Sequence, residues 1–110
     1  MREQQVLSLL GMARRAGRLS IGHDAAVEAI VKNRARLCLC SADASARLQR
    51  EMQHNCSYEN KSIPYLTLTF PMAELSKAIG SRAAVVTVND EGFAERLASL
   101  LSEMQNTGKE

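Results

Sequence analysis

The sequence predicts an α/β protein with a three-layer α-β-α sandwich and a mixed sheet of about four strands. Two observations predict this class. Segments with helical spacing of apolar residues alternate along the chain with short apolar runs of strand length. Two of these runs, 36–40 and 83–88, are almost continuously apolar, which is typical of strands covered on both faces. We therefore expect helices on both sides of the sheet and strands that run mainly parallel at its centre.

Two amphipathic helices are predicted in the first third of the chain, separated by a short strand at 19–21. Both have apolar residues at the spacing that places them on one helical face. The first is expected to end near Gly17, because glycine readily takes the left-handed conformation that follows a helix. The second begins near Gly22 and ends near Asn33. The apolar positions are Val6, Leu9, Leu10 and Ala13 in the first helix and Ala26, Val27, Ile30 and Val31 in the second.

The rest of the chain continues the alternation. After the strand at 36–40, Ser41 to Ser45 form a turn rich in capping residues, and a helix follows with apolar Leu48, Met52 and Cys56. Residues 63–68 are β-like, and Pro64 places them at an edge or at a strand start. Pro71 is expected as the first residue of a helix that stops at Gly80. After the strand at 83–88, Asn89 and Asp90 cap a last helix, whose apolar face is Phe93, Leu97, Leu100, Leu101 and Met104.

The length of 110 residues indicates one domain, 1–104, followed by a polar tail, 105–110, that is expected to fray. No apolar run approaches the roughly 20 residues of a membrane span, and the first residues do not resemble a secretory signal. The three cysteines form no CxxC motif and no disulfide framework, which fits a reducing cytosol. These features predict a cytoplasmic protein without a membrane partner.

The charge of the chain is unevenly distributed. Residues 1–36 contain seven Lys or Arg against three Asp or Glu, a net charge of +4, whereas residues 71–110 have four against six. Three arginines, Arg14, Arg15 and Arg18, lie within five positions and lead into the helix at Gly22. A basic segment beside a helix N-terminus favours an anionic ligand, because exposed N–H groups and the helix dipole both attract negative charge. This pattern is compatible with nucleic-acid binding.

Three short motifs together resemble the L7Ae/L30e/S12e/Gadd superfamily of ribosomal proteins, and most closely its small bacterial branch. They are LGMARRAGRL at 10–19 with Gly22 beyond it, CSADAS at 40–45, and LSKAIG at 75–80. The resemblance covers about residues 4–98. Members of this superfamily have the same sandwich fold and typically bind RNA, in many cases a kink-turn. The resemblance therefore implies a structured RNA partner, of kink-turn or ribosomal kind, and a role connected with the ribosome or translation.

The superfamily usually contacts RNA through a Gly-x-Asn-Glu motif at the start of the second helix, with a lysine three residues after the Glu. Here the glycine is Gly22, but the other three positions hold Asp24, Ala25 and Glu28. An ionised Asp only accepts hydrogen bonds, Ala25 makes none, and Glu28 reverses the charge of the lysine. RNA binding would then rest on backbone N–H groups at 22–24 and on basic side chains, including Arg82 in the loop that is the superfamily's second contact. The candidate RNA-binding residues are Arg14, Arg15, Arg18, Gly22, His23, Asp24, Lys32 and Arg82.

Simpler roles for these residues remain open. The three clustered arginines are also compatible with solvated helix-end charges, and Gly22 with a tight turn alone. Asp24 is equally explained as a first-turn carboxylate, and Arg82 as a solvent-exposed side chain. His23 is expected at an exposed helix start, where its ring is able to stack on a base or contact a phosphate.

Catalytic and metal-binding patterns are missing from the sequence. Cys38, Cys40, His54 and Cys56 fit no common zinc spacing, and Cys38 and Cys40 alternate along an apolar strand with both facing one side. No nucleophile with a recognisable base is present. We therefore predict a non-enzymatic RNA-binding protein without cofactor or metal. The alternative is a protein-interaction module on the same fold that has lost kink-turn recognition, with a protein partner in the translation machinery.

Overall fold

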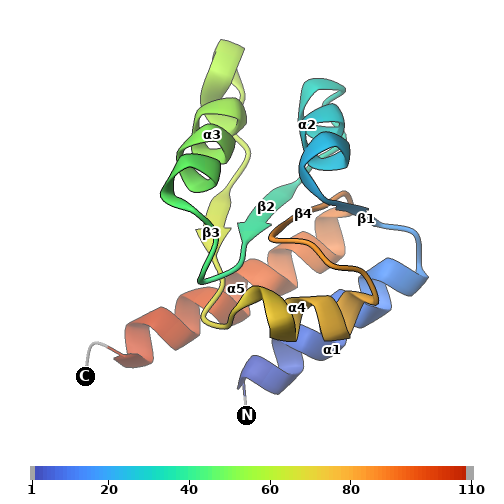
Figure 1. The fold of residues 1–110 in the computed structure, drawn as a ribbon, viewed down its shortest axis with the longest axis vertical. Helices are drawn as coiled ribbons and strands as arrows, with labels where there is room; N and C mark the ends of the chain where they lie inside the picture. Colours follow the sequence, from blue (N-terminus) through green and yellow to red (C-terminus); the bar gives the residue numbers. More distant parts are fainter. Residues whose placement is uncertain (1, 109–110) are drawn as a thin grey trace.

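The computed structural model describes residues 2–108, and side chains as far as Met104. Helices and strands alternate through this part of the chain, as expected from the sequence (Figure 1). The elements are α1 (Arg2–Arg15), β1 (Leu19–Ile21), α2 (His23–Val31), β2 (Leu37–Cys40), α3 (Ala46–Ser57), the short 3-10 helix η1 (Tyr58–Asn60), β3 (Tyr65–Thr67), α4 (Met72–Ile79), β4 (Val85–Val88) and α5 (Glu91–Gly108).

The four strands form one mixed sheet in the order β1-β4-β2-β3. Only β2 and β3 run parallel, whereas β4 pairs antiparallel with both of its neighbours. The expectation of a mainly parallel centre was therefore wrong. A run of apolar residues shows that both faces of a strand are covered, but it does not determine the direction of the strand. Here β4 lies between β1 and β2, and its direction is opposite to that of both.

Helices cover both faces of the sheet, which confirms the three-layer sandwich (Figure 1). On one face α1, α4 and α5 pack against Leu37 and Leu39 of β2. On the other face α2 and α3 pack against Cys38 and Cys40. The two cysteines thus face one side of the strand, as predicted, and lie in the smaller core together with Cys56. The alternation of side chains along β2 divides the apolar residues into two cores.

Most of the predicted helix ends are confirmed. Gly17 and Gly80 both have a φ of 73°, the left-handed conformation that ends α1 and α4. The hydroxyl of Ser45 accepts a hydrogen bond from the Leu48 N–H at 3.1 Å and caps α3. The carboxylate of Asp90 accepts one from the Phe93 N–H at 2.9 Å at the start of α5.

Two helix boundaries differ from those expected from the sequence, the start of α4 and the end of α5. Pro71 is not the first helical residue, because its ψ of 171° is extended and α4 begins at Met72. The Met72 N–H donates instead to the carboxylate of Asp43 at 2.9 Å. At the other end of the chain, α5 continues to Gly108, so residues 105–108 of the expected tail are helical, and residues 109–110 lie outside the described residues. The domain boundary at residue 104 stays a prediction.

Candidate nucleic-acid interface

The sheet has two ends that present different groups. At one, which we call the Gly22 end, β1 and β2 end and β4 begins; at the other, the Arg18 end, β1 and β2 begin and β4 ends. Hydrogen bonds fix the loops at each end. The Ser41 N–H donates to the Ala84 carbonyl at the Gly22 end, and the Asn89 N–H donates to the Arg18 carbonyl at the Arg18 end, at 2.9 and 2.8 Å. The start of α2, the turn after β2 and the loop before β4 therefore meet at the Gly22 end.

Gly22 connects β1 to α2 with a backbone conformation that favours glycine. Its φ is 94° and its ψ 169°, and its N–H donates to the Val85 carbonyl at 2.9 Å. This N–H is therefore not available to a ligand, which corrects the expectation for residues 22–24. Within residues 2–108, no acceptor is bonded to the backbone N–H groups of His23, Asp24 and Ala25. The first turn of α2 thus presents unsatisfied donors at its positive end.

The loop before β4 is linked to α1 through Arg14. The guanidinium of Arg14 lies beside Gly80, where an added Cβ would be 3.8 Å from its Cζ and Nε atoms. One turn earlier on α1, an added Cβ on Gly11 would lie 3.3 Å from the Ala78 carbonyl oxygen. The two helices therefore cross closely, and two of the motifs singled out in the sequence touch each other. This crossing places the positive charge of Arg14 beside the loop that contains Arg82.

All four candidate arginines are exposed, and none has a carboxylate partner among the described residues. In the part of the chain that the structure describes, no ion pair involves Arg14, Arg15, Arg18 or Arg82. All four side chains are exposed to solvent. Arg14 and Arg82 lie beside and within the loop before β4, whereas Arg15 lines a groove between α1 and α4. Unpaired guanidinium groups on a surface are suited to phosphate, which they bind with two parallel hydrogen bonds.

His23 is engaged by two carboxylates rather than free. Its Nδ1 lies 2.9 Å from Asp24 Oδ1, and its Nε2 lies 2.7 Å from Glu51 Oε2 on α3. The hydrogen bond with Asp24, followed by the one with Glu51, raises the pKa of His23 above its ordinary value. Both ring nitrogens are thus occupied, although the side chain remains 47% exposed. The imidazole joins the start of α2 to α3 at the Gly22 end.

Two of the candidate residues lie away from this surface. Arg18 precedes β1, four residues and about 13 Å along the strand from Gly22, so it lies at the opposite end of the sheet. Lys32 is the C-cap of α2, a helix of about 13 Å, and its ammonium is bound to Glu28 at 3.0 Å. From the sequence we expect both residues to share one RNA-binding surface with Gly22. The structure separates them because β1 and α2 each carry the chain from one end of the sheet to the other.

Two arginines that were not among the predicted RNA-binding residues lie on α3, next to the Gly22 end. Arg47 and Arg50 are exposed, and neither forms an ion pair within the described residues. The contact between Glu51 and His23 brings this part of α3 beside the start of α2. The sequence signal that points to them is the pair of arginines at the start of the helix after CSADAS, with no acidic residue between them. They add positive charge next to His23 and its two carboxylate partners, Asp24 and Glu51.

The turn at 41–45 has a structural role, as predicted. The carboxylate of Asp43 accepts hydrogen bonds from the Met72 N–H and from the Ser41 hydroxyl, at 2.9 and 2.8 Å. These bonds lower the pKa of Asp43. Asp43 therefore fixes α4 to the turn after β2, and with it the loop that follows α4. Within residues 2–108, no three His, Cys, Asp or Glu side chains form a group suited to a metal ion, and none of the described helices is both long and apolar enough to cross a bilayer.

Comparison with known proteins identifies relatives of this domain. The sequence profile of the ribosomal protein L7Ae/L30e/S12e/Gadd45 family matches residues 4–98. A protein named RNA-binding protein YlxQ from Bacillus subtilis (strain 168) is 38% identical over 94 residues, which are 84% of this chain and 91% of the relative. A protein of the same name from Enterococcus faecium is 30% identical over 98 residues, covering 89% and 92%.

Solved structures agree with this relationship. A protein described as of unknown function from Bacillus halodurans C superposes with a TM-score of 0.79 and 33% identity, covering 88% of this chain and 96% of that one. The Giardia lamblia 15.5kD RNA binding protein superposes with a TM-score of 0.71 over 96% of this chain and 88% of its own, at 16% identity. The second similarity establishes the fold alone.

Proposed function

The chain belongs to the ribosomal protein L7Ae/L30e/S12e/Gadd45 family, and from this premise we propose that it is a non-enzymatic RNA-binding protein. Two relatives carry the name RNA-binding protein. The observation that carries the proposal is the arrangement of donors and cations at the Gly22 end of the sheet. There the unsatisfied N–H groups of α2 lie at the same end as Arg82, whose loop also contacts the guanidinium of Arg14. Donors and unpaired cations around one loop are suited to phosphates of a folded RNA chain.

The proposed contact reads the shape and the phosphates of RNA more than its bases. Ala25 has no group to contact a base, and Asp24 presents a fully exposed carboxylate that only accepts hydrogen bonds. Glu28 is held in ion pairs with Lys32 and Arg34, at 3.0 and 3.6 Å. These groups replace the side chains by which the family commonly reads a kink-turn. Binding would therefore rest on Arg14, Arg82 and the backbone donors of α2.

The proposed RNA is a folded one of kink-turn or ribosomal kind, and the proposed setting is the translation machinery of the cytoplasm. Family membership supports this assignment, since the family takes its name from ribosomal proteins. A phosphate-directed surface suits a folded RNA, because a bent backbone brings several phosphates close together. No metal or cofactor is part of the proposal.

A second candidate function is docking of a protein partner at the same end of the sheet. The observation that favours it is the negative charge of Asp24 and Glu51 beside the first turn of α2, which opposes phosphate and would suit a basic protein segment. Retention of a stable protein partner by the tagged chain after nuclease treatment would support this function. Loss of all partners after the same treatment would support RNA binding.

Fluorescence anisotropy with labelled RNA tests the main proposal. The full chain is titrated with a kink-turn RNA and with a straight duplex of the same length, at several salt concentrations. We expect binding that weakens steeply with salt, and its loss in the double variant Arg14→Glu with Arg82→Glu. Arg96→Glu is the control for each of the two charge reversals made singly, because Arg96 is exposed on α5 and forms no ion pair among the described residues. Unchanged affinity in the double variant would refute the location of the site.

A further inference from the structure

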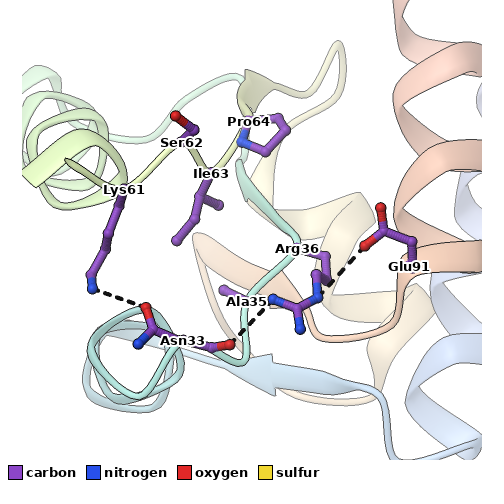
Figure 2. A pocket seen from close by; sticks show the side chains of 8 residues that line it. All are labelled: Asn33, Ala35, Arg36, Lys61, Ser62, Ile63, Pro64 and Glu91. Atoms are coloured by element: carbon purple, nitrogen blue, oxygen red, sulfur yellow. Dashed lines mark hydrogen bonds and ion pairs between the residues drawn. The ribbon is translucent and has the colours of Figure 1, made fainter.

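We propose that a pocket at the Arg18 end of the sheet binds the phosphate of a nucleotide. Figure 2 shows the residues that line this pocket, which has a volume of about 390 Å³. It lies at the far end of the sheet from the proposed RNA contact, because its residue Arg36 is hydrogen-bonded to Val88, the last residue of β4. Two segments and one further residue form its wall. They are Asn33, Ala35 and Arg36 between α2 and β2, Lys61 to Pro64 before β3, and Glu91 at the start of α5.

The walls of the pocket are fixed by the sheet. The Arg36 N–H donates to the Val88 carbonyl at 2.8 Å, and the Cys38 N–H donates to the Pro64 carbonyl at 2.9 Å. Asn33 takes a left-handed conformation, with a φ of 60°, in the turn that ends α2. Its backbone carbonyl accepts a hydrogen bond from the Arg36 guanidinium at 3.2 Å. The pocket is therefore part of the folded domain rather than a gap between loose loops.

Two cations reach this pocket, and neither is fully neutralised. Lys61 is half-buried, and the hydrogen bond of its ammonium is to a neutral group, the side-chain oxygen of Asn33, at 3.0 Å. Arg36 has Glu91 as its carboxylate partner, with 3.6 Å between the closest atoms, which is longer than a hydrogen bond. Figure 2 shows both side chains extending toward Asn33, from different walls of the pocket. The lining thus contains two positive charges and one negative charge, which favours an anion.

The shape of the lining favours an anion larger than inorganic phosphate. A volume of about 390 Å³ is in the range of small-molecule sites and far above that of one phosphate group. Ala35, Ile63 and Pro64 supply an apolar surface beside the cations, and Figure 2 shows the Ile63 side chain directed into the pocket. A phosphate at Lys61 and Arg36 would leave this surface for the sugar and base. A nucleoside monophosphate, free or as the 5′ end of an RNA chain, combines the two parts.

The test is an amide chemical-shift titration of the ¹⁵N-labelled full chain with adenosine monophosphate. Adenosine, which lacks the phosphate, is the ligand control. We expect the nucleotide to shift amides at 33–36 and 61–63, and adenosine at the same concentration to leave them unchanged. The proposal is overturned if the nucleotide leaves these amides unshifted or if adenosine shifts them equally.

Variants identify the groups responsible. Lys61→Gln and Arg36→Gln should each weaken nucleotide binding about tenfold, because each removes a charged hydrogen-bond donor. Arg96→Gln, which removes the same charge on the exposed side of α5, should leave the affinity unchanged. A dispersed spectrum of each variant verifies that it is folded. Wild-type affinity in both pocket variants would overturn the proposal.

Two further titrations separate the sources of the phosphate and the two sites. A short single-stranded RNA with a 5′ phosphate that binds more tightly than adenosine monophosphate, with shifts at 33–36 and 61–63, identifies the end of an RNA chain as the ligand. Equal or weaker binding of that RNA identifies a free nucleotide. The double variant Arg14→Gln with Arg82→Gln should keep full nucleotide binding, since those residues lie outside the pocket lining. Failure of one site is thereby distinguished from failure of the other.

Discussion

The N–H of Gly22 donates to the carbonyl of Val85 at 2.9 Å, and this bond joins the start of α2 to the first residue of β4. Two segments that are 63 positions apart in the chain therefore meet at one end of the sheet. The bond occupies a donor that the sequence alone suggests is available to a ligand. It also places the N–H groups of His23 to Ala25 beside the loop that contains Arg82.

The conformation of Gly22 gives a prediction about stability. A φ of 94° with a ψ of 169° is a combination found almost exclusively in glycine, whereas the left-handed φ of 73° at Gly17 is less restrictive. No atom lies within 4 Å of a Cβ added at either position, so the backbone alone determines the cost. We expect Gly22→Ala to lower the free energy of unfolding by roughly 1–3 kcal/mol, and more than Gly17→Ala. Urea denaturation measures both, and an equal or smaller loss for Gly22→Ala would contradict this prediction.

The unpaired arginines give a prediction about the salt dependence of RNA binding. Each phosphate contact that is lost should reduce the slope of the logarithm of affinity against the logarithm of salt concentration by about one. We expect Arg14→Gln and Arg82→Gln each to show such a reduction, with similar effects on kink-turn and straight RNA. Arg96→Gln provides the control for the loss of one charge far from the Gly22 end. The contact is excluded for either arginine whose variant has the slope of the wild type.

Asp24 gives a prediction in the opposite direction. Its carboxylate is fully exposed at the first turn of α2, where it repels phosphate. The amide introduced by Asp24→Asn would still accept a hydrogen bond from His23, would also donate one, and would remove the repulsion. We expect RNA affinity to increase about three- to tenfold at low salt, which corresponds to about 1 kcal/mol. Glu95→Gln on α5 makes the same charge change as a control, and equal gains in the two variants would show that Asp24 has no local effect.

His23 gives a prediction about pH. Because its hydrogen bonds with Asp24 and Glu51 raise its pKa in the folded protein, the folded state holds the proton more tightly than the unfolded state. The stabilisation is complete below the unfolded pKa of about 6.5 and is lost as the pH rises through the folded pKa. We expect His23→Gln to lower the free energy of unfolding at about pH 6 by up to about 1 kcal/mol, and by less at about pH 9, since the exposed pair is screened by solvent. Chemical denaturation at both pH values measures the difference, and a larger loss at the higher pH would contradict it.

Local chemistry made most of the fold predictable. Gly17, Ser45, Gly80 and Asp90 end or cap helices where the sequence placed them, because each role depends on that residue and its near neighbours. The direction of β4 was not predictable in this way. Val86 and Val88 face one core and Val85 faces the other whichever way the strand runs, and the direction depends on how the loop from α4 returns to the sheet.

The candidate site was predictable only in part for the same reason. Arg14, Arg82 and the first turn of α2 were identified from motifs, and the structure brings them to one loop. The bonds that shape the site join residues far apart in the chain, such as His23 and Glu51. No local pattern contains such a contact. The same limit explains why the pocket at Lys61, whose walls come from three separate parts of the chain, emerged only from the folded chain.

Ultraviolet crosslinking of the full chain to bound RNA, followed by mass spectrometry of the crosslinked peptides, tests the location of the RNA contact most directly. We expect crosslinks within residues 22–25 and within the loop at 80–84, and fewer of them in the double variant Arg14→Gln with Arg82→Gln. Crosslinks confined to α5, with none in those two segments, would contradict it.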